Sequence, residues 1–424
     1  MGRRVWNMAL AEQRARHARG EKYAGHAEMC KWLTAWRNAP STAWLAQGPS
    51  QAQQQVLRRL DEAYKRFFAA AKAGQAGGRG RTGPPEFKRY GDEPGIRFPD
   101  PKQFSLDAPN GRIQLPKLGW VRLRMSQPVE GKLRNVSITK EGSGKGAKWF
   151  ASIQVETNET VPALGIEPTL GIDLGLAQFA AFSEEVLCTA GNGNAPRALQ
   201  HHVAPLKALA KQQVRLKRYQ RSVARKKKGS ANRKKAVAKL GNLHRRIAHQ
   251  RNDWLHKLST DLADAHPVIA LEDLRIRNMS ASAKGTVEAP GKMVRLKAGL
   301  NRGILDAAWG EFARQLSYKV EWRGGRVILV NPAYTSRTCR ICAHEDAENR
   351  KSQALFECVA CGHAENADVH ASKNILAAGH AVWARASKDA SLDACGGEVS
   401  RGRRASAGRA APSKQEPTEA KVLV

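Results

Sequence analysis

The sequence predicts a multidomain α+β protein, and three observations support this class. The chain has 424 residues, 42% of them apolar, so it can bury several cores, and two to four domains are expected. Its apolar residues recur at helical spacing up to residue 73 but alternate between about 86 and 160. Four of the seven cysteines lie within residues 339–361. This composition excludes a basic disordered tail and a single small domain.

The net charge of +33 indicates a polyanionic partner. Nucleic acid is the commonest polyanion, and an anionic membrane surface is the alternative. However, the sequence contains no run of about 18 apolar residues, and its first residues, MGRRVWNMAL, lack the apolar segment of a signal peptide. We therefore expect a cytoplasmic, nucleoid-associated protein with no membrane partner.

Residues 1–73 are predicted to be helical. Ser50 and Gln53 fit a capping box, and apolar residues at helical spacing follow them up to Phe68. The tryptophans of this region are expected in the core rather than as base-stacking platforms; they are Trp6, Trp32, Trp36 and Trp44. A Gly/Pro-rich linker is predicted at residues 74–85.

Alternating residues between about 86 and 160 predict a small antiparallel sheet or barrel. Its outward positions are rich in Lys and Arg, including Arg122 and Arg124. These cations would suit a nucleic-acid backbone, although a plain solvated face explains them equally well.

A strongly basic segment, residues 203–252, contains 17 Lys or Arg and no acidic residue. Two runs at helical spacing flank the loop KKKGSANRKK, so the segment predicts a long helical hairpin. Its predicted nucleic-acid ligands are Lys226, Lys227, Lys228, Lys234 and Lys235. Beyond it we expect apolar strands at 268–274 and 326–332 and an amphipathic helix at about 302–322.

The clustered cysteines have the spacing of a structural zinc site. Two C-x-x-C turns, Cys339 with Cys342 and Cys358 with Cys361, are separated by fifteen residues. Four thiolates complete a tetrahedron around one Zn²⁺ and leave no position for a catalytic water. The remaining cysteines are expected to be ordinary reduced thiols; they are Cys30, Cys188 and Cys395.

Three acidic residues stand at informative places in this acid-poor chain. Asp173 and Glu272 each lie near the end of an apolar strand, and Asp368 starts a short helix after the last cysteines. A carboxylate closing an apolar strand is costly unless it is paired or binds a metal. Three such groups suit hard divalent cations, and two ions about 4 Å apart can catalyse phosphodiester cleavage. Individually, Asp173 could be a turn residue and Asp368 a helix N-cap.

The sequence resembles the TnpB (OrfB) family encoded by insertion sequences, relatives of the type V CRISPR effector nucleases. The resemblance covers about residues 165–380, and its most specific segments are GIDLG (171–175), ALEDL (270–274), FECVACG (356–362) and NADVHASKNI (366–375). It implies a RuvC-like nuclease domain of the RNase H fold, in which Asp173, Glu272 and Asp368 are the catalytic acids.

The resemblance also implies a domain organisation. The expected parts are a helical recognition domain (1–85), a wedge-like β-barrel (86–165), the RuvC-like domain (166–335, with the basic insert at about 200–262), a zinc-ribbon target-nucleic-acid-binding insert (336–365), the end of the RuvC-like domain (366–385) and a disordered tail (386–424).

The implied function is RNA-guided, Mg²⁺-dependent DNA cleavage in a prokaryote. Two Mg²⁺ ions, replaceable by Mn²⁺, would sit at the three acids, and one Zn²⁺ in the ribbon. A transposon-end RNA would guide a monomer to double-stranded DNA beside a target-adjacent motif. Base pairing supplies specificity in such systems, while basic surfaces hold the A-form hybrid.

Two features depart from the family pattern. Family members usually begin with a strand and a short helix before the segment resembling WNMALAE (6–12), so we expect either that the start is truncated or that the barrel closes differently. His370 also stands where Asn is common, two residues after the third acid.

Two other functions remain alternatives to the nuclease. The first is a guide-directed DNA-binding protein without cleavage, either N-terminally truncated or regulatory. The complete set of three acids favours cutting. The second is a strand-joining transposase, which the sequence does not favour because no tyrosine or serine nucleophile motif stands out.

Overall fold

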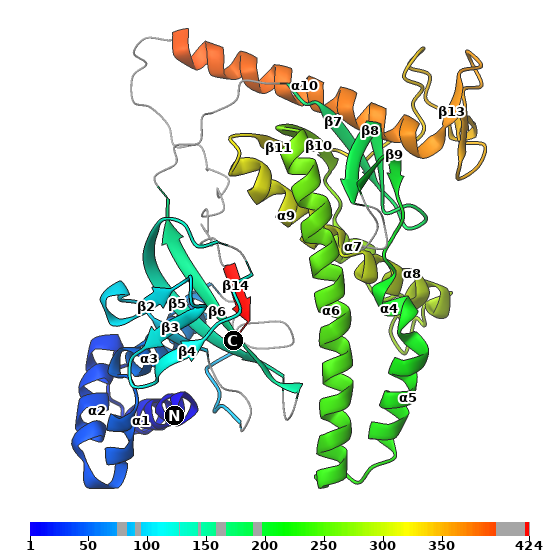
Figure 1. Cartoon of the computed structure of the whole chain (residues 1–424). Helices are drawn as coiled ribbons and strands as arrows, with labels where there is room; N and C mark the ends of the chain where they lie inside the picture. Colours follow the sequence, from blue (N-terminus) through cyan, green and yellow to red (C-terminus); the bar gives the residue numbers. More distant parts are fainter. Residues whose placement is uncertain are drawn as a thin grey trace. The chain divides into compact units, whose positions relative to one another are not determined.

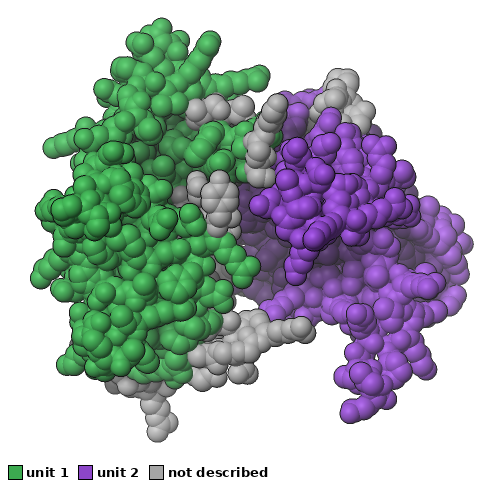
Figure 2. Space-filling view, turned by 90° about the horizontal axis from the view of Figure 1, so that it is seen from below, with its two compact units in different colours: residues 1–159, 407–424 green, residues 160–406 purple. Residues whose placement is uncertain are grey.

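The computed structural model describes residues 1–73, 83–89, 95–126, 128–142, 146–157, 167–189, 197–395 and 420–423, with side chains up to residue 385. The chain divides into two compact units, one of residues 1–159 with 407–424 and the other of residues 160–406 (Figure 2). Most of the predicted linker lies outside the described residues. In the part of the chain that the structure describes, no helix combines the length and apolarity needed to span a membrane.

The first unit begins with helices, as predicted. They are α1 (Gly2–Ala18), α2 (His26–Asn38), the 3-10 helix η1 (Pro40–Gln47) and α3 (Ser50–Lys72). Trp6, Trp32 and Trp36 pack in or against their common core, which confirms the prediction for these three. Trp44 is instead 37% exposed.

The predicted capping box at the start of α3 is wrong. Ser50 is already the first helical residue, and no side chain caps the helix. Gln53 is buried because it anchors the preceding turn. Its amide donates to the Leu45 carbonyl over 2.8 Å and accepts from Arg37 Nη1 over 2.7 Å. A tertiary contact has replaced the local one that the pattern suggested.

The strands of the first unit form two antiparallel sheets around one core. One sheet has the order β1-β5-β6-β14, and its strands are β1 (Ile96–Phe98), β5 (Lys132–Glu141), β6 (Lys148–Glu156) and β14 (Ala420–Leu423). The other contains β2 (Ser105–Asp107), β3 (Arg112–Leu115) and β4 (Gly119–Arg122), after the short 3-10 helix η2 (Pro101–Gln103). Phe98, Ile113 and Val136 share their core. The antiparallel pairing is confirmed, whereas closure into a barrel stays a prediction.

A five-stranded mixed sheet organises the second unit (Figure 1). Its order is β11-β10-β7-β8-β9, and its strands are β7 (Leu170–Leu174), β8 (Ala180–Thr189), β9 (Arg197–Val203), β10 (Val268–Glu272) and β11 (Arg326–Val330). The first three strands pair antiparallel, while β10 runs parallel to both β7 and β11. The multidomain α+β class is therefore confirmed at the level of mixed sheets and helices.

Helices cover both faces of this sheet. The helical segments are α4 (Ala208–Lys211), α5 (Gln213–Ala224), α6 (Ala231–Ala265), α7 (Ile276–Met279), α8 (Val294–Ala307), α9 (Trp309–Glu321), η4 (Ala347–Asn349) and α10 (Ala367–Cys395). Trp254 of α6 and Phe312 of α9 pack with Ile172 on one face, and Ile375 of α10 packs with Ala270 on the other. Burial on both faces explains why these strands are nearly continuous apolar runs.

Three helical predictions have definite outcomes. The basic hairpin is confirmed as α5 and α6. The helix expected at about 302–322 begins earlier and is broken at Ala308, whose φ of 56° is left-handed. The tail predicted to be disordered from residue 386 is helical as far as Cys395, and residues 396–419 lie outside the described residues.

Two glycines allow α10 to lie close to the sheet. A Cβ on Gly171 of β7 would stand 2.1 Å from the Ser372 carbonyl oxygen, and one on Gly379 would stand 2.6 Å from Ala270 Cβ of β10. Any larger residue at either position would push the helix away. The approach matters because α10 carries Asp368 at its start.

Candidate active site and zinc-type metal centre

Strand alternation places Asp173 and Glu272 on the same face of the sheet. In β7, Leu170, Ile172 and Leu174 belong to the core under α6 and α9, so Asp173 faces the α10 side. In β10, the residues facing α10 are Val268 and Ala270, and Glu272 continues their alternation. The parallel register pairs Leu271 with Ile172, which brings Glu272 beside Asp173.

Asp368 reaches the same place from the first turn of α10. It is not the N-cap, because Asn366 caps this helix by accepting from the backbone N–H groups of Asp368 and Val369 over 3.0 and 3.2 Å. The Asp368 side chain is therefore free to face the sheet. A carboxylate in the first turn is also favoured by the helix dipole.

The three acids line one cavity of about 310 Å³. Burial raises the pKa of Asp173 to about 7, and the neighbouring carboxylates of Glu272 and Asp368 add to this shift. Burial also raises the pKa of Glu272, while the Thr335 hydroxyl opposes the shift. This donor set fits hard divalent cations, which bind carboxylate oxygens and would neutralise the crowded charge.

The sequence did not single out two polar residues of this cavity. Arg350 Nη2 donates to Asp368 Oδ1 over 3.0 Å, and the Thr335 hydroxyl donates to Glu272 Oε1 over 2.9 Å. Arg350 gave no signal because it is one of 71 cations in the chain. Asp273, the residue after Glu272, is exposed and does not line the cavity.

The four predicted cysteines come together with the geometry of a zinc site. Their sulfurs all lie within 4.8 Å of one another, with 3.7 Å from Cys339 to Cys361 and 3.5 Å from Cys342 to Cys358. A tetrahedral ion with Zn–S bonds of about 2.3 Å places its sulfurs about 3.8 Å apart. The residues therefore fit a zinc-type ion.

Each cysteine pair lies in a matching backbone turn. Cys339 N–H donates to His344 O and Cys358 N–H to His363 O, both over 2.9 Å. The left-handed position of the second turn is Gly362, with φ 68°, whereas the first turn has Ala343 there, with φ 59°. The strands β12 (Leu355–Glu357) and β13 (Ala364–Asn366) pair antiparallel beside the two turns, and the name zinc ribbon is used below for residues 336–366.

The predicted nucleic-acid ligands are distributed over both units. Lys226, Lys227, Lys228, Lys234 and Lys235, here called the tip lysines, surround the turn between α5 and α6. All but the partly buried Lys226 are exposed, and none forms an ion pair among the described residues. Arg122 and Arg124 are exposed in the first unit.

The cysteines outside the zinc-type centre were expected to be reduced thiols. Cys30 and Cys188 are free thiols, and the Cys395 side chain is outside the described part.

Comparisons with known proteins identify relatives of this chain. A model described as "Cas12f1-like, TNB domain" matches residues 309–375, and one described as "Probable transposase" matches residues 152–283. The "Putative RNA-guided DNA endonuclease InsQ" of Escherichia coli (strain K12) is 42% identical over 98% of this chain and 91% of its own length. A "Putative RNA-guided DNA endonuclease" of Streptomyces pristinaespiralis is 30% identical over 99% and 91%.

A solved Cas12f1–sgRNA–target DNA complex was also matched. It has 15% identity and a TM-score of 0.30, and the match covers 88% of this chain and 91% of that one. The sequence relatives, which match almost the whole chain, carry the assignment. This chain belongs to the TnpB (OrfB) family of insertion-sequence-encoded proteins.

Proposed function

We propose that the protein is an RNA-guided DNA endonuclease of a transposable element. It hydrolyses phosphodiesters at Asp173, Glu272 and Asp368 in a RuvC-like domain. One observation carries the proposal: carboxylates from β7, β10 and α10, far apart in sequence, line a single cavity on one face of a sheet. A structural ion pair needs only one carboxylate and one cation, whereas three acids with one arginine leave negative charge for metal ions.

The sheet and the relatives support this function. Three antiparallel strands followed by two parallel ones, with the acids on the face that α10 covers, suit the RNase H fold. Both relatives carry the name "Putative RNA-guided DNA endonuclease". The exposed tip lysines supply the cationic surface that a nucleic-acid phosphate backbone requires.

Five residues of the cavity have definite tasks. The three carboxylates would hold two Mg²⁺ ions, or Mn²⁺ in their place, which supply an activated water and stabilise the leaving oxygen. Thr335 fixes the orientation of Glu272 by its hydrogen bond. Arg350 fixes Asp368 and brings positive charge to the cavity wall, where a scissile phosphate needs it.

The remaining features belong to the same proposal. The guide is an RNA from the transposon end, and the target is double-stranded DNA with an adjacent motif, bound by one protein chain. The four cysteines hold one structural Zn²⁺. The domain boundaries are those expected from the sequence, except that the last part of the RuvC-like domain extends along α10. The protein acts in the prokaryotic cytoplasm, at the nucleoid.

A cleavage assay tests the proposal. The chain is co-expressed with its flanking transposon-end RNA and mixed with a plasmid library carrying a matched target. We expect Mg²⁺-dependent cutting that is lost in Asp173→Ala and Glu272→Gln, while both variants still bind the target. Asp273→Asn is the matched control and should cut normally, because Asp273 is exposed beside Glu272.

Binding without cleavage separates the alternatives. If the wild-type chain binds the matched target tightly but does not cut in Mg²⁺ or Mn²⁺, the protein is a guide-directed binder. If Asp273→Asn abolishes cleavage as fully as Glu272→Gln, the assignment of acids to the cavity is wrong.

A further inference from the structure

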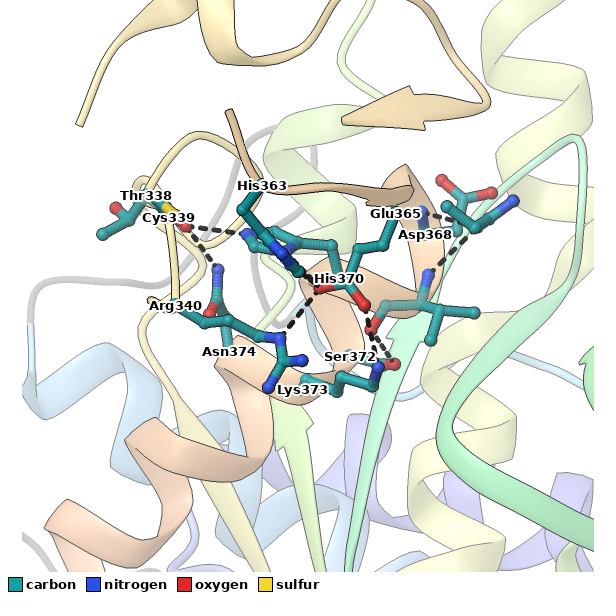
Figure 3. A network of polar contacts seen from close by, with 12 residues as sticks. Thr338, Cys339, Arg340, His363, Glu365, Asp368, His370, Ser372, Lys373 and Asn374 are labelled. Atoms are coloured by element: carbon teal, nitrogen blue, oxygen red, sulfur yellow. Dashed lines mark hydrogen bonds and ion pairs between the residues drawn. The ribbon is translucent and has the colours of Figure 1, made fainter. Parts of the chain in front are cut away.

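A second polar cluster lies between the zinc ribbon and the start of α10. Its centre is Glu365 of β13, whose carboxylate accepts from both sides (Figure 3). From the ribbon, Arg340 Nε lies 2.9 Å and His363 Nε2 3.1 Å from Oε1. From α10, His370 Nδ1 lies 2.6 Å from Oε1, and Lys373 Nζ donates to Oε2 over 2.8 Å. One carboxylate thus joins two structural elements.

His370 adds further contacts between α10 and the ribbon. Its side chain is fully buried, and its ring stacks on Phe356 of the ribbon with 3.6 Å between centroids and 13° between planes. Its second nitrogen, Nε2, lies 2.9 Å from the backbone carbonyl of Thr338, the residue before the first zinc-site cysteine. Asn374 of α10 also donates to Thr338 O, over 2.8 Å. The helix therefore holds the ribbon backbone directly.

Neighbouring side chains already satisfy the charge and hydrogen-bonding capacity of the Glu365 carboxylate. Burial alone would raise the pKa of Glu365, but the hydrogen bonds from Lys373, His363 and His370 lower it well below its usual range. His363, Glu365 and His370 have the donor types of a metal site, and their ligand atoms lie within 4.8 Å of one another. However, Lys373 and Arg340 already place two positive charges against this carboxylate, which opposes a divalent ion there.

The cluster around Glu365 lies close to Asp368, the third proposed catalytic acid. Asp368 is three residues beyond Glu365 and two before His370, so its turn of helix is fixed at both ends. At the cavity, Arg350 of the ribbon donates to Asp368. Arg350 in turn follows the fully buried Asn349, which bonds to Arg337 O, His344 O and Val359 N and so ties it to both cysteine turns.

We propose that Glu365 and His370 are positioning residues that form a latch, locking the zinc ribbon onto α10 so that Arg350 and Asp368 meet at the cavity. The inference rests on the proposed function for its consequence in catalysis. It makes the ribbon part of the active-site wall as well as a nucleic-acid-binding insert. Opening the latch loosens Asp368 without touching any of the three catalytic acids or the four cysteines.

The test uses the full chain with guide RNA and the variants Glu365→Gln and His370→Ala. We expect the Mg²⁺ concentration for half-maximal cleavage to rise by about 10-fold or more, the usual effect of removing a residue that orients a metal ligand. Hydrogen exchange of residues 366–373 should become faster, while zinc content stays at one ion per chain. His370→Asn keeps a donor toward Glu365 and should recover part of the affinity for Mg²⁺.

Glu357→Gln is the matched control, because Glu357 makes the same chemical change on the exposed side of the same ribbon. The latch is refuted if Glu365→Gln alters neither the Mg²⁺ requirement nor the exchange, or if it releases the zinc. It is also refuted if the wild type holds a second transition metal that Glu365→Gln removes. If the wild type cuts nothing, the proposed function fails, and hydrogen exchange alone decides the latch.

Discussion

The close approach of α10 to β7 can be tested by one methyl group. In Gly171→Ala the new Cβ would stand 2.1 Å from the Ser372 carbonyl oxygen, and 2.8 and 2.9 Å from the backbone nitrogen and Cβ of Leu376. The nearest of these atoms is backbone, so no side-chain rotation relieves the contact. The helix or the strand must move.

The distances give the size of the movement. Real Cβ atoms essentially never lie under 3.0 Å from such a neighbour, so the two elements must separate by at least 0.9 Å. Asp368 begins this helix and Asp173 lies two residues along the strand, so their separation grows by a similar amount. A misplacement of about 1 Å can lower a rate about 100-fold, and overpacking of this kind costs about 1–3 kcal/mol of stability.

Plasmid cleavage and thermal unfolding of the same preparations measure both effects. Gly241→Ala in α6 is the matched control: its Cβ would meet nothing within 4 Å, so it should cut normally and gain about 0.5–1 kcal/mol. Gly379→Ala should behave like Gly171→Ala. Adding Ala270→Gly to Gly379→Ala should restore cleavage and stability, because it removes the Cβ that the new methyl group contacts. Wild-type cleavage and melting in Gly171→Ala would refute the reasoning.

Three further predictions concern the hairpin, the ribbon and the core. Replacing the tip lysines by Gln should weaken DNA and RNA binding equally for all sequences. The slope of log affinity against log salt should fall by about 0.9 for each phosphate that the protein no longer neutralises. An unchanged slope in a filter-binding titration would show that these lysines are only a solvated face. Ala343→Gly should raise the chelator concentration that releases the zinc, because left-handed backbone costs a non-glycine residue about 1 kcal/mol. Gly362→Ala should lower this concentration for the same reason. Equal zinc release by the wild type and both variants would exclude strain in these turns. Burial lowers the pKa of Lys319 to about 8 from its ordinary 10.5, so the unfolded chain binds more protons between these values, and stability should rise with pH from 8 to 10.5. Chemical unfolding at several pH values should show this rise in the wild type and a smaller one in Lys319→Met, and identical curves would contradict it.

The sequence predicted those parts of the fold that follow from local periodicity. Apolar residues at helical spacing identified the hairpin, because one stripe of each helix must be buried. The cysteine spacing identified the ribbon, because each C-x-x-C turn presents two sulfurs to one ion. The three acids were found because a carboxylate beside an apolar strand is unusual in so basic a chain.

Other features depend on contacts between distant residues and leave no local signal. The left-handed residue of the break is Ala308 itself and not the nearby Gly310, so the sequence does not mark its position. Gln53 matched a capping pattern, but its amide bonds to a neighbouring turn. Arg350 and Glu365 became conspicuous only when the fold placed them against Asp368 and His370. Charge alone could not select one arginine among so many.

The alternation along β7 and β10 also determines where the chain can change its length. Inserting or deleting one residue at the start of β7, before Ile172, would turn Asp173 toward α6 and Ile172 toward α10, so the core and the proposed catalytic acid would be disrupted together. The turn between α5 and α6 carries no such constraint, because its residues are mostly exposed. New segments for reading other nucleic acids are therefore best tolerated at the hairpin tip, whereas these strands do not accept insertions.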